Sequence, residues 1–234
     1  KLPKEEWGFF HAYLDPGSTR FSTVRNINKQ PSEGFSLAAD DHGTVTACWL
    51  ADKLHANISH DDGESFGASV ELNPSYNPCN CCTTSAVYGA DGRLAVLYRE
   101  ETDNHRDMYL VLWDQSSGAT TRKRVSRTSW TIDSCPMTYF AIARGPAGPG
   151  YTAVWPTKGQ INFAHLDSRG DFVNDGEIPT PGRSGMRTGM LALNGPAGST
   201  LVVWKHHDSL GWQRYDSEGR PREAAGSASS AGQG

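Results

Sequence analysis

The residue types with the greatest chemical potential in this sequence are the cysteines. Four of the five fall in two short segments: Cys79, Cys81 and Cys82 lie within four residues, and Cys135 precedes Met137 by two residues. A cysteine thiolate is a nucleophile and a soft metal ligand, and two thiols can also oxidise to a disulfide. The grouping therefore indicates a metal site, a disulfide framework or a reactive thiol.

A metal site needs ligand atoms on the same side of the chain. If residues 79–82 are extended, alternation directs Cys79 and Cys81 to one side and Cys82 to the other. Two thiols on one side, together with Cys135 from the second segment, can surround one ion. The spacing therefore predicts a thiolate site built from two loops.

Two further residues extend the predicted ligand set. Met137 adds a soft thioether, and His206, adjacent to His207, adds an imidazole if it points at the cysteines. Sulfur ligands favour copper(I) over hard cations. Zinc is the second choice, because the spacing is not that of the paired Cys-x-x-Cys segments of zinc ribbons and fingers.

Two other interpretations of the four clustered cysteines stay open. They can form a pair of disulfides that join neighbouring structural units, as suits an exported protein, or one of them can be a redox thiol with a lowered pKa. The fifth, Cys48, lies inside the alternating segment that ends at Trp49. We expect it to be a small buried thiol.

The elements that must position these residues follow a repeat. Short alternating segments end in an aromatic residue, at separations of 49, 57 and 49 residues: Trp49, Tyr98, Trp155 and Trp204. Aspartate turns recur at intervals of 46, 53, 53 and 49 residues: Asp15, Asp61, Asp114, Asp167 and Asp216. A period of roughly 50 residues with about four short strands is typical of a β-propeller blade, because stacked sheets bury faces that one sheet alone leaves exposed.

The repeat predicts an all-β fold, namely a β-propeller of four-stranded blades. Blades start near residues 34, 83, 137 and 187, and residues 7–31 supply only the outer two strands of a closing blade. The chain then holds about four and a half blades of a five- or six-bladed ring. We expect one domain over residues 1–226 and a flexible tail at 227–234, with the missing strands supplied by a continuing chain or another subunit.

A motif in the first blade carries a family resemblance. Residues 59–66, Ser59 to Phe66, match the Asp-box, Ser-x-Asp-x-Gly-x-(Ser/Thr)-(Trp/Phe), and degenerate copies occur at Asp15, Asp167 and Asp216. The chain thus resembles the Asp-box (BNR-repeat) propellers, a superfamily that includes sialidases. The resemblance implies the propeller fold, but it says little about activity, because the box lies on outer turns in enzymes and non-enzymes alike.

The cysteine segments carry a closer resemblance. A Cys-x-Cys-Cys segment before one blade and a Cys-Pro segment before the next, here at residues 79–82 and at Cys135-Pro136, are similar to segments of exported bacterial sialidase-like proteins. This resemblance implies a secreted or periplasmic protein. It implies no settled biochemical activity.

Propeller geometry predicts one face that collects the candidate residues. The loop that enters the innermost strand of a blade and the loop between its second and third strands open on the same face. Alignment of the blades places Glu33, Cys82, Met137 and Arg187 at equivalent positions. We expect all four at the mouth of the central channel.

A sialidase-type hydrolase would use other residues of this face. Its chemistry needs three arginines for the substrate carboxylate, a tyrosine activated by a glutamate, and an acidic residue. The candidates are Arg99, Arg106 and Arg187 for the arginines, Asp107 for the acid and Tyr139 for the tyrosine. No glutamate partner can be assigned to Tyr139 from the sequence.

Composition argues against two classes of function. The 22 basic and 26 acidic residues give a net charge of −4, without the basic stripe that nucleic-acid binding needs. Hydrophobic residues make up 37%, enough for a packed core, and no apolar run approaches the roughly 18 residues of a membrane span. Lys1 begins directly in charged sequence, as expected of a mature exported chain or of one that starts late.

Three functional hypotheses follow. The first is an exported propeller whose channel-mouth cysteine cluster binds a soft metal, copper before zinc, as a binding or electron-handling protein. The second is a sialidase-type glycoside hydrolase with disulfide-stapled loops. The third is a non-catalytic propeller that binds a glycan or a protein.

Overall fold

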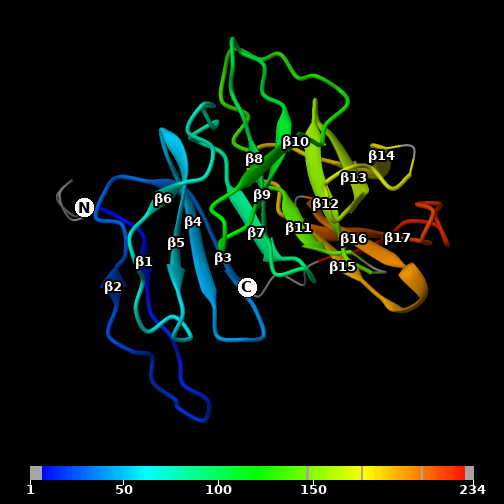
Figure 1. Cartoon of the computed structure of the whole chain (residues 1–234). Helices are drawn as coiled ribbons and strands as arrows, with labels where there is room; N and C mark the ends of the chain where they lie inside the picture. The colour runs from blue at the N-terminus through cyan, green and yellow to red at the C-terminus, as the bar shows by residue number, and fades with distance from the viewer. Residues whose placement is uncertain (1–6, 146–147, 175, 207, 230–234) are drawn as a thin grey trace.

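The computed structural model of the chain describes residues 7–145, 148–174, 176–206 and 208–229. Nearly all regular structure in these residues is β, interrupted by a 3₁₀ turn at Pro196–Gly198. The strands form four four-stranded antiparallel sheets and a two-stranded sheet. Figure 1 shows these sheets side by side in a fan.

Each four-stranded sheet is one blade, with its strands in chain order. Blade 1 comprises β3 (Glu33–Ala39), β4 (Val45–Ala51), β5 (Lys53–Ser59) and β6 (Val70–Glu71), and blade 2 comprises β7 (Thr84–Tyr88), β8 (Leu94–Arg99), β9 (Met108–Trp113) and β10 (Thr120–Arg124). Blade 3 comprises β11 (Ala141–Arg144), β12 (Gly150–Thr157), β13 (Gln160–Asp167) and β14 (Ile178–Arg183). Blade 4 comprises β15 (Met190–Asn194), β16 (Thr200–His206), β17 (Ser209–Tyr215) and β18 (Gly226–Ser229). The two-stranded sheet is made of β1 (Phe10–His11) and β2 (Arg25–Asn26).

The first strands of successive blades lie next to one another. β3 contacts β7, β7 contacts β11, and β11 contacts β15. The remaining strands of each blade lie progressively farther from this inner edge, because each pairs only with its neighbours in the chain. This is the arrangement of a multi-bladed β-propeller, so the predicted fold is confirmed.

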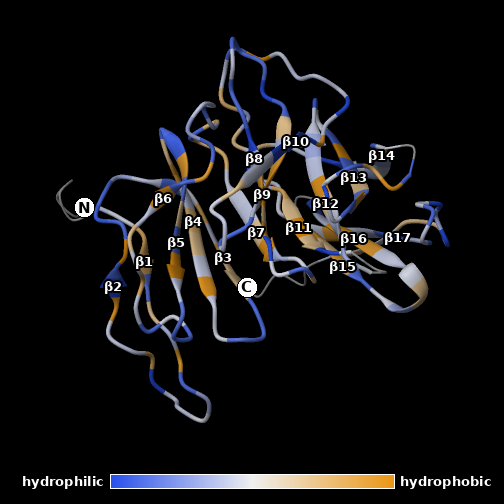
Figure 2. Cartoon of the chain, in the orientation of Figure 1, coloured by the Kyte–Doolittle hydropathy of each residue, from blue (hydrophilic) through white to orange (hydrophobic). Residues whose placement is uncertain are grey.

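Apolar side chains fill the spaces between neighbouring blades. Leu50 of blade 1 and Tyr98 of blade 2 belong to one buried cluster, Leu97 of blade 2 and Trp155 of blade 3 belong to the next, and a third joins blades 3 and 4. Adjacent residues on a strand point to opposite faces, so Leu97 and Tyr98 pack against different neighbours. Figure 2 shows the hydrophobic residues gathered in the strands and hydrophilic residues in most loops.

The aspartate turns share one hydrogen-bond pattern. The Asp61 carboxylate accepts hydrogen bonds from Ser65 N at 2.9 Å and from Ser65 Oγ at 2.6 Å, and Gly63 has a φ of +88°. Asp167 and Asp216 likewise accept from the N–H groups two and four residues later. Each carboxylate thus fixes a tight turn that needs a residue with positive φ. Membership of the Asp-box family stays a prediction.

β18 corrects the predicted tail. Residues 227–229 pair with β17, and Gly226 lies opposite Trp212, where a Cβ would come within 2.3 Å of the indole ring. The expectation of a flexible tail from residue 227 is therefore wrong for 227–229, because an edge strand needs only backbone hydrogen bonds and small residues fit beside the ring. Residues 230–234 lie outside the described residues.

The two ends of the fan differ. At one end the β1–β2 sheet lies beside blade 1 (Figure 1). There Phe9 packs edge-on against Trp49 with ring centroids 6.4 Å apart. At the other end, blade 4 exposes Leu191 and Leu193 of β15 and Leu210 of β17. No helix in the described part of the chain has the length and apolar character to cross a membrane.

Candidate functional site

The first cysteine segment folds as a tight turn directly before β7. The N–H of Cys82 donates to the carbonyl of Cys79 at 2.9 Å, and the N–H of Cys79 donates to the carbonyl of Arg99 at 2.8 Å. The prediction that Cys82 points away from Cys79 and Cys81 is therefore wrong, because alternation applies to an extended chain and this segment turns.

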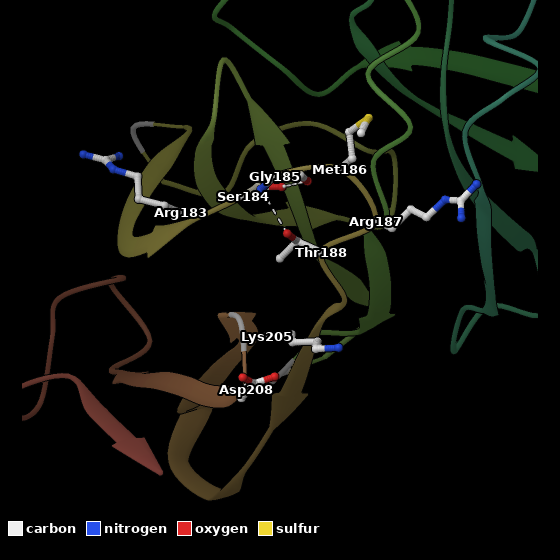
Figure 3. Close-up of a pocket in the computed structure, with 8 residues that line it drawn as sticks. All are labelled: Arg183, Ser184, Gly185, Met186, Arg187, Thr188, Lys205 and Asp208. Atoms are coloured by element: carbon white, nitrogen blue, oxygen red, sulfur yellow. Dashed lines mark hydrogen bonds between the residues drawn. The ribbon is translucent and has the colours of Figure 1, made fainter. Parts of the chain in front are cut away.

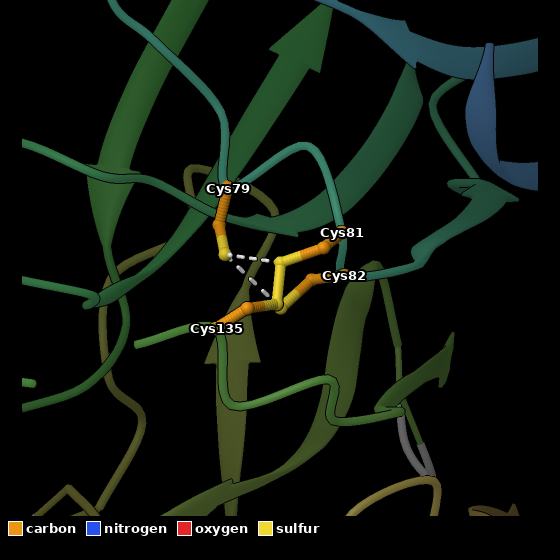
Figure 4. Close-up of side chains that lie close together, drawn as sticks. All are labelled: Cys79, Cys81, Cys82 and Cys135. Atoms are coloured by element: carbon orange, nitrogen blue, oxygen red, sulfur yellow. Dashed lines mark hydrogen bonds between the residues drawn. A yellow bond between two sulfur atoms is a disulfide. The ribbon is translucent and has the colours of Figure 1, made fainter. Parts of the chain in front are cut away.

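Four cysteine sulfurs meet at this turn. The Sγ atoms of Cys79, Cys81, Cys82 and Cys135 all lie within 4.8 Å of one another. Cys79 Sγ is 3.5 Å from Cys81 Sγ and 3.4 Å from Cys82 Sγ. Cys81 and Cys135 form a disulfide with their Cα atoms 6.5 Å apart, whereas Cys79 and Cys82 are free thiols (Figure 4).

The geometry of this group suits a metal ion. Sulfur atoms around a tetrahedral ion at bond lengths of about 2.3 Å are separated by about 3.8 Å. The separations of 3.4 and 3.5 Å between the Sγ of Cys79 and those of Cys82 and Cys81 are close to that value. The group can therefore hold a metal ion when its sulfurs are reduced.

Two guanidinium groups supply positive charge to the cluster. Arg106 Nη1 lies 3.1 Å from Cys79 Sγ. Arg99 is completely buried and donates to the Pro156 carbonyl at 2.7 Å and to the Arg106 carbonyl, and no carboxylate in the described residues forms a salt bridge with it. A buried charge without a salt-bridge partner favours negative charge nearby, and the groups whose charge acts on Arg99 are Cys82, Cys79 and Asp107.

The two free thiols share this environment unequally. The hydrogen bond with Cys79, the charge of Arg99 and the Thr138 N–H lower the pKa of Cys82 to about 6. The pKa of Cys79 is raised, because it keeps the proton that the pair shares and because it is buried. The pair therefore loses its first proton from Cys82, which gives the cluster a thiolate near neutral pH. Cys48 behaves differently, since burial raises its pKa to about 12.

The cluster borders a hollow at the inner edge of the blades. The hollow has a volume of about 520 Å³. Its lining includes residues of all four blade entries: Glu33, Phe35, Cys81, Cys82, Met137, Tyr139 and Arg187. The four residues expected at equivalent positions therefore share one cavity, and the Arg187 N–H donates to the Met137 carbonyl at 2.8 Å.

A second hollow of about 480 Å³ adjoins Arg187. Lys205 of β16 and Asp208 of the β16–β17 connection line it on one side. Arg183, which ends β14, and Arg187 of the segment before β15 line it on the other (Figure 3). The guanidiniums of Arg183 and Arg187 point in opposite directions, so they do not grip one ligand carboxylate together. His206 ends β16, and its side chain lies outside the described part of the structure.

The candidate catalytic residues are spread over different environments. Tyr139 and Arg187 line the 520 Å³ hollow. Arg99 is buried and Arg106 contacts a cysteine, so neither presents a free guanidinium to that hollow. Asp107 accepts from the Trp130 N–H at 2.9 Å and pairs with Arg124 at 2.8 Å, which holds the loop after β10.

The structure contains a buried tyrosine–glutamate pair that the sequence did not predict. The Tyr98 hydroxyl donates a hydrogen bond to the Glu100 carboxylate. The same carboxylate accepts hydrogen bonds from Arg122 Nε at 2.6 Å and from Asn73 Nδ2 at 3.2 Å. Arg122 lies 3.7 Å above the ring of Tyr109. Tyr98 is 1% exposed and burial raises its pKa, so this pair is a structural network rather than an accessible nucleophile. The spacing of Tyr98 and Glu100 by two residues was the available signal, since it puts both on one side of the chain.

Comparison with known proteins identifies the fold. No protein-family model and no curated relative matches the chain. The SapL1 lectin, solved with alpha methyl fucoside, has a TM-score of 0.58 at 12% identity over 96% of this chain and 75% of its own. The Penicillium chrysogenum alpha-L-arabinanase, solved with arabinobiose, has a TM-score of 0.52 at 12% identity over 93% of this chain and 66% of its own.

A third similar structure is the endo-arabinase of Bacteroides thetaiotaomicron. Its TM-score is 0.50 at 12% identity, over 82% of this chain and 81% of its own. The β-propeller fold of this chain is thus shared with a lectin and two arabinanases. Identities this low bear on the fold alone.

Proposed function

We propose that this protein binds one soft metal ion, copper(I) before zinc, through Cys79, Cys81, Cys82 and Cys135. The observation that carries the proposal is the convergence of their four Sγ atoms within 4.8 Å. The sulfurs come from two loops more than fifty residues apart in the chain. Burial of Cys79 and Cys82 in a setting with two guanidiniums gives these sulfurs an environment that a purely structural disulfide does not need.

The chemistry of the donor set favours copper(I). All four donors are sulfur, and Met137 lines the same hollow as Cys81 and Cys82 and offers a thioether. Soft sulfur ligands select copper(I) and zinc over magnesium or calcium. Arg106 offsets the negative charge that several thiolates bring to one ion. We propose a binding or electron-handling role for this site. The Cys81–Cys135 disulfide is compatible with the secreted or periplasmic setting that we also propose.

Copper(I) titration of the reduced chain tests the proposal. We expect about one equivalent of copper(I) to resist competition by bathocuproine disulfonate under anaerobic conditions. Cys79→Ser and Cys82→Ser should each weaken binding strongly. Cys48→Ala is the matched control, because Cys48 is a free buried thiol in blade 1 and belongs to a different core cluster. Binding that survives in both cluster variants, or fails in the native chain, would refute the assignment.

A glycan-binding role is the second candidate. It is supported by the fold likeness to a fucoside-binding lectin and by the aromatic residues at the rim of the larger hollow, Phe35 and Tyr139, beside Arg187. Aromatic faces and guanidiniums are common contacts for sugar ligands. Binding to a glycan array that is lost in Tyr139→Ala would support it. Hydrolysis of a fluorogenic sialoside that is lost in Arg187→Ala would favour the sialidase-type hydrolase instead.

Further strands from a continuing chain or another subunit stay our proposal for completing the ring. The exposed Leu191, Leu193 and Leu210 on the outward face of blade 4 support it. Corresponding faces of the other blades pack against a neighbour. An apolar sheet face in water is unfavourable and fits a covered surface.

A further inference from the structure

We propose that the Cys81–Cys135 disulfide is the redox gate of the metal site, and that an external dithiol opens it by thiol–disulfide exchange at Cys81. This inference rests on the proposed function and names its regulation. A disulfide sulfur has no thiolate charge to give to a metal, so the oxidised chain offers two thiols at the cluster and the reduced chain offers four.

Access to the cluster is uneven. Cys79 and Cys82 are 1% and 2% exposed, whereas Cys81 is only partly buried and lines the 520 Å³ hollow. Thiol–disulfide exchange requires the attacking thiolate to reach one sulfur of the disulfide. Cys82 also lines the hollow but is nearly inaccessible, so a small dithiol in the hollow reaches Cys81 more readily than it reaches either free thiol.

The exchange is balanced with a dithiol as the named reductant. One thiolate of the dithiol attacks Cys81 Sγ and forms a mixed disulfide, and the electron pair of the broken bond leaves with Cys135 Sγ. The second thiolate of the dithiol attacks the mixed disulfide, releases Cys81 and closes the cyclic disulfide of the reductant. Two electrons reach the protein, and the products are two cysteine thiolates that take up protons or a metal.

Hydrogen bonds other than the disulfide tie both cysteine loops to the end of β8 and the connection that follows it. On the side of the first loop, the Cys79 N–H donates to the Arg99 carbonyl at 2.8 Å. On the side of the second loop, three bonds reach the same connection and β8. Arg106 N–H donates to the Trp130 carbonyl at 2.8 Å, and Ile132 N–H donates to the Asn104 carbonyl at 2.9 Å. Arg99 adds a bond to Thr138 Oγ1 at 3.3 Å. Breaking the disulfide therefore leaves the four sulfurs close together, as Figure 4 shows them, and the reduced site is largely formed before a metal arrives.

Thiol counting joined to copper titration tests the gate. The oxidised chain should titrate three thiols after unfolding and the chain treated with dithiothreitol should titrate five. With the dithiothreitol removed anaerobically, copper(I) affinity should be at least about tenfold higher in the reduced form. A Cys81→Ser/Cys135→Ser double variant should bind weakly whether or not it is treated, and Cys48→Ala should respond as the native chain does.

Two failures have different meanings. Equal copper(I) affinity in the two redox forms would overturn the gate and leave the metal site standing. Absence of tight binding in both forms, although thiol counting shows that the disulfide opens, would overturn the proposed function and the gate with it. Mass mapping of the mixed disulfide that forms with 2-mercaptoethanol, trapped by an acid quench, checks the route: the adduct should lie on Cys81, and an adduct on Cys135 would overturn attack at Cys81.

Discussion

The guanidinium of Arg106 lies 3.1 Å from the Sγ of Cys79. Arg99 ends β8, and Arg106 lies on the connection between β8 and β9. The Arg106 carbonyl accepts a hydrogen bond from the Arg99 guanidinium. Arg99 therefore helps to position Arg106, and Arg106 in turn contacts the cysteine cluster. Their charges favour thiolate over thiol, which is the form that binds a soft metal.

Removing this charge should weaken metal binding without removing a ligand. We expect Arg106→Met to lower copper(I) affinity by about tenfold, the effect of losing roughly 1.4 kcal/mol of electrostatic stabilisation. Chelator competition on the reduced variant measures the change. Arg169→Met is the matched control, because Arg169 is largely exposed on a turn of blade 3 and should leave affinity unchanged. Equal losses in both variants would contradict a specific role for Arg106.

Metal affinity should depend on pH through the thiols. A metal replaces protons on its cysteine ligands, so affinity rises with pH until the thiols are ionised in the free protein. The hydrogen bond with Cys79 and the charge of Arg99 lower the pKa of Cys82 to about 6. Above that pH the Cys82 thiol is already ionised, so it no longer contributes to the rise of log metal affinity with pH. Affinity should therefore fall more steeply below about pH 6 than above it. A slope that does not steepen there in the native chain would show that Cys82 has no lowered pKa.

The propeller and its blade boundaries could be predicted because they depend on a repeat. Each blade buries residues in the same pattern, so aromatic residues such as Trp49 and Trp155 recur at a spacing that one sequence displays. The edge strand at 226–229 could not be predicted, because its small residues carry no apolar alternation and its backbone bonds alone hold it to β17.

The cysteine site was only partly predictable. The grouping in sequence indicated that residues 79–82 and Cys135 meet, since adjacent blades bring their entry loops together. The Cys79-x-x-Cys82 spacing is compatible with the turn that the structure contains. The prediction missed this turn because it assumed that residues 79–82 are extended. Pairing of Cys81 with Cys135 depends on side-chain positions that no spacing rule supplies.

The Asp61 turn should stabilise blade 1 in a pH-dependent manner. Hydrogen bonds from Ser59 and Ser65 lower the pKa of Asp61 to about 2. A lowered pKa in the folded state means that the contribution is complete above the unfolded pKa of about 3.9 and is lost as the pH falls toward 2. Asp61→Ala should lower the melting temperature at pH 7 and have a smaller effect near pH 2. Glu64→Ala, at an exposed position of the same turn, should change little at either pH.

The Tyr98–Glu100 pair should matter for stability and not for hydrolysis. Tyr98→Phe removes the hydroxyl that Glu100 and Asn73 both contact, and an unsatisfied buried polar group costs about 1–3 kcal/mol. Urea unfolding should show this loss. The exposed Tyr139 serves as control, since Tyr139→Phe should leave the free energy of unfolding nearly unchanged. Sialidase activity abolished by Tyr98→Phe in a folded variant would contradict the structural role.

X-ray absorption at the copper edge of the reduced, copper-loaded chain tests the central claim most directly. We predict a first coordination shell made only of sulfur, at a distance of about 2.3 Å. The same measurement on Cys82→Ser should show fewer sulfur neighbours. A first coordination shell of nitrogen or oxygen in the native chain would contradict a metal centre built from these four cysteines. Loss of the copper when unbound metal is removed before the measurement would contradict it as well.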